Sequence, residues 1–385
     1  RILLVVDGVR MNNAIYRKGH LQNSITVAPS ILDKTEVIFG PSSVIYGSDA
    51  LGGVIHYYTR KPKLSERTNV NLEFLGRYST VNEEKTVNAA VELQFEKIAS
   101  FTSVSHSSFG DLHMGESRRH GFDNWGLQYE YSNNSDTFYN EEPVINSDPS
   151  IQRNVGYQQT DFLQKLFLPL KRGNDVMFNL QYSKSSDINR FDKLTERRDG
   201  KLRFAEWYYG PQERFLFSTQ FNINAKKKWL DKGSFTAAYQ NIKESRVNRR
   251  FESFDRASNF ENVKVLSLNG DFTKNMNPSL GRNFGYGFEL AYNDVNSTSK
   301  GEVLDVVGNS IVGIKDNYTV QTRYPDGGSS YMSSAVYASY RQDIGKKSTL
   351  NTGLRITNTV LTAKWVDTTF IKLPESDIKT MNTSV

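Results

Sequence analysis

The sequence predicts a mostly-β fold, an antiparallel transmembrane β-barrel preceded by a small α/β domain. Three observations predict it: strands of about ten residues with a two-residue hydrophobic period, connections that alternate between short and long, and an N-terminal stretch of different character. We expect the α/β domain to occupy residues 1–62 and the barrel strands to occupy residues 63–385.

The N-terminal stretch reads as a small mixed unit. Ile2 to Val6 is a continuous apolar run closed by the turn pair Asp7-Gly8, which suits a strand covered on both faces. A second strand is expected at Thr35 to Phe39, followed by a brief helix that ends at Tyr46. Because the chain starts at Arg1 inside an apolar strand, we expect the natural protein to have residues before it.

From about Thr68 onward, apolar and polar residues alternate. Val70, Leu72 and Phe74 share one face of the first strand, while Asn71 and Glu73 share the other. Each run is about ten residues long, the length with which a tilted strand crosses a bilayer. The expected strands are 69–79, 86–95, 98–107, 159–169, 176–186, 214–226, 234–246, 259–272, 283–296, 331–343 and 349–359, followed by a strand-like stretch at 359–373.

The connections support the barrel. Short turns follow the even-numbered strands, whereas long polar connections follow odd-numbered ones, notably 108–158, 187–213 and 297–330. The first connection, 80–85, is short and departs from this rule. Outer-membrane barrels have short turns on one side and long loops on the other. We expect a further hairpin near residues 127–131, and a soluble β-sandwich or propeller remains the alternative fold.

Composition narrows the functional classes. Hydrophobic residues make up 37% and no run approaches the ~20 apolar residues of a membrane-spanning helix. The 23 Phe and 20 Tyr can supply the interfacial girdles of a barrel, and the absence of Cys excludes disulfides and Cys-based metal sites. No nucleophile elbow, phosphate loop or metal-ligand spacing is present, so we expect no enzyme, no cofactor, no metal and no nucleic-acid partner.

Three segments occur in a specific order near the N-terminus: Leu4-Val5-Val6-Asp7-Gly8-Val9-Arg10, Glu36-Val37-Ile38-Phe39-Gly40-Pro41-Ser42-Ser43-Val44, and Tyr46-Gly47-Ser48-Asp49-Ala50-Leu51-Gly52-Gly53-Val54-Ile55. Together they resemble the C-terminal half of the plug of TonB-dependent outer-membrane receptors. The resemblance implies a chain in the cell outer membrane, in contact with outer-membrane lipid, that supplies about half of a 22-stranded barrel with the plug inside it. The remaining strands are expected outside this chain.

The same resemblance implies a function. It points to TonB-dependent import of a scarce nutrient, with a ferric siderophore, haem or a haemoprotein as ligand. A vitamin B12 or oligosaccharide importer remains open, as does a non-transporting surface adhesin or haemoprotein-docking barrel. The segment with which the family contacts TonB would precede residue 1.

Candidate site residues follow from the family's plug. The loop after Asp-Gly-Val-Arg lies near the extracellular apex in that family and is basic and amide-rich here, which suits an anionic chelate or a porphyrin carboxylate. A solvated loop whose Asn side chains cap turns is the alternative. Phe39 stands where many members carry an arginine, so the sequence lacks that residue for a plug–barrel ion pair. The predicted substrate-binding residues are Arg10, Asn12, Asn13, Tyr16, Arg17 and His20; Gly47, Gly52 and Gly53 are predicted to permit tight turns at the plug–barrel junction.

Two weaker patterns remain. His106, His113 and His120 recur at intervals of seven, which fits either a haem ligand or surface histidines in a polar loop. Aromatic residues and arginines are mixed in the connection 187–213, which fits either a ligand site or a membrane-interface belt. The residues of that second pattern are Phe191, Trp207, Tyr208, Tyr209, Arg197, Arg198 and Arg203.

Overall fold

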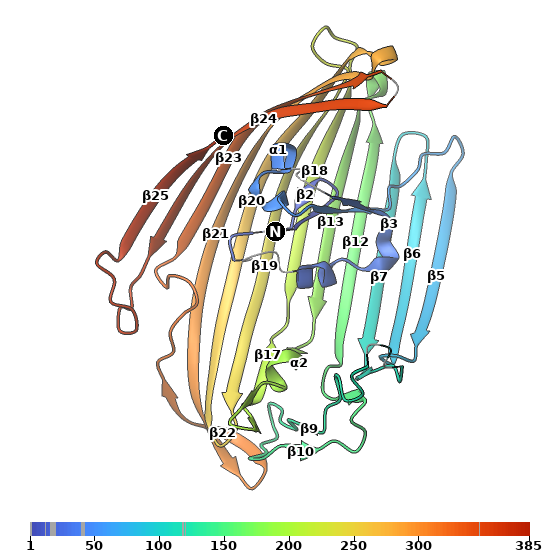
Figure 1. The fold of residues 1–385 in the computed structure, drawn as a ribbon. Helices are drawn as coiled ribbons and strands as arrows, with labels where there is room; N and C mark the ends of the chain where they lie inside the picture. The colour runs from blue at the N-terminus through green and yellow to red at the C-terminus, as the bar shows by residue number, and fades with distance from the viewer. Residues whose placement is uncertain are drawn as a thin grey trace.

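The computed structural model describes residues 2–11, 13–15, 21–39, 43–117, 119, 121–345 and 347–385. Two β-sheets hold most of them, a four-stranded sheet of the N-terminal segment and a fifteen-stranded sheet of the rest (Figure 1). The large sheet curves around the small one, so the N-terminal segment lies on its concave face. We call residues 2–59 the N-terminal domain and the twelve long strands of the large sheet the wall.

The N-terminal domain is a mixed sheet with strand order β2-β1-β4-β3. The strands are β1 (Leu3–Val6), β2 (Val9–Arg10), β3 (Leu32–Ile38) and β4 (Val54–Thr59). β1 pairs antiparallel with β2 and parallel with β4. Short helices join them: α1 (Ser43–Tyr46) and the 3-10 helices Leu21–Thr26, Pro29–Ile31 and Ser48–Ala50.

All four residues of β1 are buried, as expected for a strand covered on both faces. Leu3 and Val5 pack within the domain, in a cluster with Ala50 and Val54. The opposite face packs against the wall. That second cluster consists of Leu4, Val6, Val9, Met11 and Val27 together with Leu216 and Ala238 of the wall. The small domain therefore completes its hydrophobic core only against the wall.

The wall confirms the eleven predicted strands and adds a twelfth. Each strand pairs antiparallel with its neighbours, in the order β25-β24-β23-β21-β20-β19-β18-β13-β12-β7-β6-β5. The strands are β5 (Asn69–Ser79), β6 (Glu84–Gln94), β7 (Ala99–Phe109), β12 (Tyr157–Pro169), β13 (Asp175–Ser185), β18 (Glu213–Asn224), β19 (Lys232–Arg250), β20 (Asp255–Asn277), β21 (Arg282–Val307), β23 (Ser329–Ile344), β24 (Ser348–Lys364) and β25 (Asp377–Ser384).

The strand-like stretch expected at 359–373 is wrong in its bounds. Residues up to Lys364 belong to β24, and the next strand begins only at Asp377. Between them, the Asp326 carboxylate accepts hydrogen bonds from the backbone N–H groups of Val366 and Asp367, each at 2.8 Å. These bonds occupy donors that a strand would use for its neighbour, so the chain turns away from the sheet.

The long connections contain more regular structure than the sequence indicated. Most of the expected connection 297–330 is strand, because β21 continues to Val307 and β22 (Ser310–Tyr318) folds back on it. β19 and β20 likewise extend until residues 251–254 alone join them. Pairing between neighbours satisfies the backbone groups of these extensions, where the hydrophobic alternation ends. The remaining elements of the connections are β8 (Leu112–His113), β9 (Glu130–Tyr131), β10 (Val144–Ile145), β11 (Ile151–Gln152), β14 (Ile188–Asn189), α2 (Phe191–Leu194), β15 (Arg197–Arg198), β16 (Lys201–Leu202) and β17 (Phe204–Tyr209).

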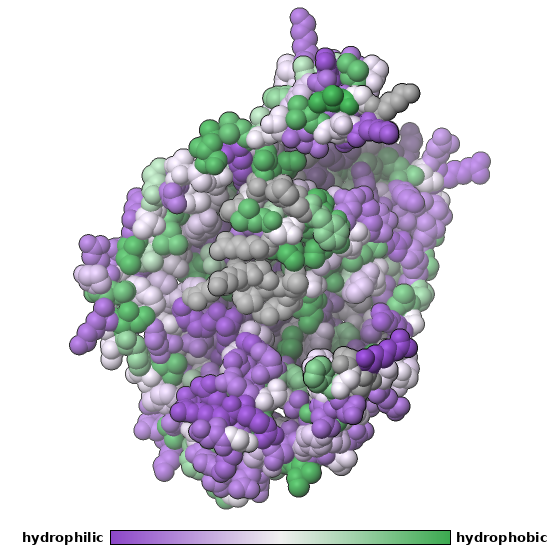
Figure 2. Space-filling view, viewed as in Figure 1, coloured by the Kyte–Doolittle hydropathy of each residue, from purple (hydrophilic) through white to green (hydrophobic). Residues whose placement is uncertain are grey.

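The hairpin expected near 127–131 is present as the β9–β10 pair. The long connections gather at one end of the wall, the lower end in Figure 1, and the short turns lie at the other. Hydrophilic side chains crowd the same lower end in the space-filling view (Figure 2).

The two faces of the wall differ in polarity. Leu72 and Phe74 point outward and are 65% and 81% exposed, whereas Asn88, Glu92 and Gln94 point inward and are buried. Such a sheet is the reverse of a soluble sandwich, whose apolar face is the buried one. Within the described residues, no helix is long and apolar enough to cross a membrane.

Candidate functional site

The Asp7 carboxylate joins the N-terminal domain to the wall. It lies in the β1–β2 turn at a φ of 47° and accepts hydrogen bonds from the backbone N–H and hydroxyl of Thr59 at 2.9 and 2.6 Å. From the wall, the Lys165 ammonium lies 3.0 Å away and the Asn179 amide donates at 3.0 Å. The Gln181 amide donates to it at 3.4 Å. One carboxylate therefore fixes the turn, β4 and two wall strands.

Among the described residues, Asp7 is the carboxylate that forms an ion pair with Lys165. Its side chain is 4% exposed, and its ammonium also donates to the Thr59 carbonyl at 3.1 Å. An ammonium that is removed from water needs both a counter-charge and hydrogen-bond acceptors. The domain supplies both at a single point.

A second ionic contact lies at the other end of β2. The Arg10 guanidinium binds Glu289 of β21 at 2.8 Å and donates to the Tyr46 carbonyl. Arg355 of β24 approaches from the wall, donating to the Ile45 carbonyl at 2.8 Å and lying 3.4 Å from Glu289. Two guanidinium groups thus share one carboxylate at the domain–wall boundary.

Gly47 lies between these two arginines. A Cβ atom there would lie 3.2 Å from an Arg10 nitrogen and 3.3 Å from an Arg355 nitrogen, and the residue has a φ of +75°. A side chain there would require both guanidinium groups to shift by a few tenths of an ångström and would hold the backbone in a strained conformation. Glycine therefore suits the ionic contact as well as the turn.

A cavity of about 180 Å³, lined by both polar and apolar side chains, opens between the domain and the wall beside Arg10. The Gly8 N–H donates to Nε2 of His56 at 3.1 Å, so Nδ1 carries the proton. That Nδ1 and Oε1 of Gln240 are buried without a hydrogen-bond partner in the described part of the chain, and both residues line the cavity. Burial lowers the pKa of His56, which favours the neutral ring. The boundary is therefore polar at its centre as well as at its contacts.

The segment beyond β2 reaches the end of the wall that carries the long connections. The Tyr324 hydroxyl donates to the Ile15 carbonyl at 2.9 Å, and Asn293 accepts from the Ala14 N–H at 3.1 Å. On the opposite side, Gln159 donates to the Ile25 carbonyl at 2.7 Å. The described parts of the predicted loop thus lie next to the long connections. A ligand is expected to arrive at this end of the wall.

The structure places the predicted site residues in different environments. Arg10 lies at the domain–wall boundary with its charge already paired. Asn13 accepts from the Ile15 N–H at 3.0 Å, while its Nδ2 is buried without a partner among the described residues. The residues Asn12, Tyr16, Arg17 and His20 lie outside the described residues. Ligand binding by this loop stays a prediction.

The predicted glycines all precede β4. Gly52 is exposed in the turn, whereas Gly53 has a φ of +129° and a Cβ there would lie 2.6 Å from the Ile38 carbonyl oxygen. The chain itself passes into the large sheet one strand later, between Thr59 and Asn69. The domain division at residue 62 falls in that segment and stays a prediction.

The histidine and aromatic patterns resolve differently. His106 contacts Thr160 at 2.9 Å and His113 lies 3.8 Å from Glu83, while His120 lies outside the described residues. Within the described residues, no group of three His, Cys, Asp or Glu side chains is arranged to hold a metal ion. Trp207 and Tyr209 stack with Arg190, at 4.6 and 5.7 Å, rather than with the predicted arginines.

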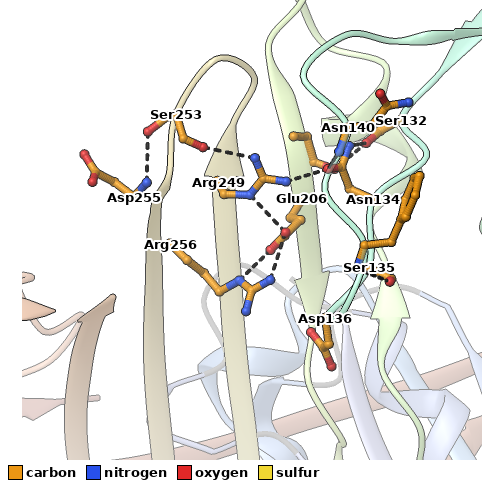
Figure 3. A network of polar contacts seen from close by, with 12 residues as sticks. Ser132, Asn134, Ser135, Asp136, Asn140, Glu206, Arg249, Ser253, Asp255 and Arg256 are labelled. Carbon is orange, nitrogen blue, oxygen red and sulfur yellow. Dashed lines mark hydrogen bonds and ion pairs between the residues drawn. The ribbon is translucent and has the colours of Figure 1, made fainter. Parts of the chain in front are cut away.

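A buried ion network in the long connections was missed by the sequence analysis (Figure 3). Glu206 of β17 accepts from Arg249 of β19 at 2.9 Å and from Arg256 of β20 at 2.7 and 3.0 Å. The Arg249 side chain is 0% exposed and also donates to Asn134 at 2.6 Å. The network therefore holds the connection 110–156 against the extended strands. The sequence feature that could have indicated this network is a single acidic residue within the apolar strand Phe204–Tyr209.

A second set of ion pairs lies beside it. Arg323, next to Tyr324, binds Glu261 at 2.7 Å and Glu244 at 3.3 Å. Because Tyr324 bonds to Ile15, the connection 319–328 contacts both the wall and the N-terminal domain. The N-terminal domain therefore contacts the long connections directly at this point.

Comparison with known proteins gives consistent results. The family model described as TonB-dependent Receptor Plug Domain matches residues 1–54. A vitamin B12 transporter, BtuB of Vibrio vulnificus strain CMCP6, is 30% identical over 268 residues, which are 70% of this chain and 35% of that protein. A hemin receptor of Yersinia enterocolitica is 45% identical over 58 residues, 15% of this chain and 8% of that protein.

Solved structures share the fold. The copper transporter OprC superimposes with a TM-score of 0.67 at 13% identity, covering 100% of this chain and 51% of that one. The unliganded ferric citrate transporter FecA gives a TM-score of 0.61 at 14% identity, covering 99% and 50%. The chain thus spans about half the length of these structures and about a third of the matched BtuB.

The Asp7–Lys165 pair can be tested by a double-mutant cycle. Asp7→Asn leaves a buried ammonium without its counter-charge and is expected to cost about 3–5 kcal/mol in free energy of unfolding. Lys165→Met combined with Asp7→Asn is expected to recover most of that loss, because Met has a similar volume and no charge. Denaturant unfolding of the purified receptor measures both.

The control for this cycle is Lys34→Met. Lys34 and Glu36 form an ion pair on β3 with exposed side chains, so the change is expected to cost less than about 1 kcal/mol. If Asp7→Asn/Lys165→Met had no greater free energy of unfolding than Asp7→Asn alone, the buried Lys165 charge would not be the cause of the loss.

The Glu206 network makes a separate prediction. Glu206→Gln leaves two arginines without their counter-charge and is expected to weaken attachment of the connection 110–156 by about 3–5 kcal/mol. Limited proteolysis of the receptor should then cleave this connection sooner. Glu252→Gln is the matched control, since Glu252 and its partner Lys201 are 65% and 81% exposed. Equal cleavage rates for the two variants would contradict the assignment.

Proposed function

Because the chain belongs to the TonB-dependent outer-membrane receptor family, we propose that it works in the energised import of a scarce nutrient across the outer membrane. The family consists of transporters rather than enzymes. The observation that carries the proposal is the polar boundary between the plug, which is the N-terminal domain, and the wall. A plug that must move needs contacts that are specific but replaceable by water.

The contacts at that boundary are of two kinds, which differ in how much their separation costs. Hydrogen bonds between the plug and the wall are exchanged for bonds to water when the plug shifts, so each contributes only about 0.5–1.5 kcal/mol net. The buried pairs of Asp7 and Arg10 cost more to separate unless water or new partners reach them. The cavity beside Arg10 places open space, lined in part by polar side chains, next to one of these pairs. Pulling by TonB, the proposed partner, would have to break these contacts first.

The proposed ligand is an iron chelate or haem. Support comes from the hemin receptor that shares 45% identity over 58 residues, and from the basic loop between Arg10 and His20. Since Glu289 already neutralises Arg10, attraction of an anionic ligand rests on Arg17, Lys18 and His20. Vitamin B12 stays the second candidate, because the BtuB relative aligns with 70% of the chain.

Uptake measurements test the function. Cells that express the receptor are expected to accumulate ferric siderophore, haem or vitamin B12 only when TonB is present and the inner membrane is energised. A non-transporting adhesin would bind the same ligand equally well without TonB. Surface binding without TonB-dependent accumulation of any of the three ligands would contradict import.

The ligand loop has its own test. Arg17→Ser is expected to weaken binding of an anionic chelate severalfold, since a charge-assisted hydrogen bond is worth about 1.5–3 kcal/mol. Lys201→Ser is the control, because Lys201 is an exposed cation of another connection. Unchanged affinity of Arg17→Ser for ferric siderophore, haem and vitamin B12 alike would remove the loop from the binding site without affecting the transport result.

A further inference from the structure

The two ends of the wall differ in charge. The five short turns, 95–98, 170–174, 225–231, 278–281 and 345–347, contain eight basic and two acidic residues. The long connection 110–156 contains three basic and eight acidic residues. The short turns are therefore strongly basic, whereas the connection 110–156 is acidic.

The cations at the two ends also differ in their partners. All six basic residues of the connection 186–212 form ion pairs, for example Arg197 with Glu130 at 2.7 Å and Lys193 with Glu196 at 2.6 Å. The described cations of the short turns are exposed and form no ion pair with any residue of the described chain. These are Lys97, Lys171, Arg172, Lys226, Lys227, Lys228 and Lys347.

Exposed apolar side chains accompany these cations. Every short turn contains or adjoins one, and the most exposed is Trp229, at 63%, directly after three lysines. The others are Phe95, Ile98, Leu170, Leu280 and Ile344, which continue the lipid-facing side of the wall. An aromatic or aliphatic side chain in the hydrocarbon with a flexible cation beside it is the arrangement found at a membrane interface.

We propose that the short-turn end binds anionic phospholipid headgroups in the periplasm-facing leaflet of the outer membrane. Short turns of outer-membrane barrels face the periplasm, which places these cations at that leaflet. The headgroup phosphates supply counter-charges to the described cations of the short turns, which form no ion pair within the described chain. The apolar side chains keep the turns at the depth of the headgroups. The turn Lys226–Trp229 is the principal contact, with Lys171, Arg172 and Lys347 on neighbouring turns.

Each lysine that contacts an anionic surface strengthens the interaction about fivefold. The interaction is electrostatic, so it weakens as ionic strength rises and the screening length falls. Neither property depends on which nutrient the receptor imports, so failure of the transport proposal would leave this inference standing.

The test uses the purified full-length receptor in nanodiscs of phosphatidylcholine with a minor share of phosphatidylglycerol. We expect phosphatidylglycerol to be enriched around the wild-type protein, as measured with spin-labelled lipids. The variant Lys226→Gln/Lys227→Gln/Lys228→Gln is expected to lose at least fivefold of that preference. Added inorganic phosphate at the same ionic strength as a chloride control is expected to displace no more lipid than chloride does.

The matched control is Arg198→Gln/Lys201→Gln/Lys300→Gln. It removes the same charge from the long-connection end, and each of these three cations has a carboxylate partner, so the lipid preference is expected to stay unchanged. Both leaflets of a nanodisc contain the anionic lipid, so both ends of the protein meet it. Comparing the turn variant with the control variant therefore shows which end causes the lipid preference. Equal preference in the wild type and the turn variant, or equal loss in both variants, would overturn the proposal. If the turn variant lost binding of an acidic periplasmic protein while its lipid preference stayed unchanged, the proposal would also be overturned.

Discussion

Backbone hydrogen bonding in a medium without water is the constraint on which this structure depends. In hydrocarbon, each N–H and C=O group must be satisfied by the protein, so a spanning β-structure is a continuous ladder of paired strands. The wall meets this demand with antiparallel pairs that run for ten or more residues, such as β12 with β13 and β20 with β21. Because side chains alternate along a strand, an apolar exterior leaves the interior free to be polar.

The polar interior decides how the N-terminal domain is held. One apolar cluster, around Val6 and Leu216, gives the domain non-directional adhesion to the wall. The ion pairs of Asp7 and Arg10 fix its position, since a charge buried against the wrong partner costs several kcal/mol. A small apolar area therefore holds the domain against the wall, and a few charges set its position.

Both the domain and the wall supply cations to the ionic contact at their boundary. The sequence has no arginine at position 39, where Phe39 is 85% exposed. Arg355 of the wall reaches the Ile45 carbonyl and shares Glu289 with Arg10. One of the two guanidinium groups in this contact therefore comes from β24 and the other from the N-terminal domain.

The sequence by itself determined the strands, their alternation and the order of short and long connections. These follow from local rules, because a period of two and the turn residues are properties of neighbouring positions. The three plug segments were also readable, because they are short stretches in a fixed order along the chain. Only the tertiary structure decided which side chains meet across the boundary: Asp7 with Lys165, Arg10 with Glu289, and Glu206 with Arg249 and Arg256. These partners are separated by at least forty residues, and their distance depends on strand register and sheet curvature, which no local pattern specifies.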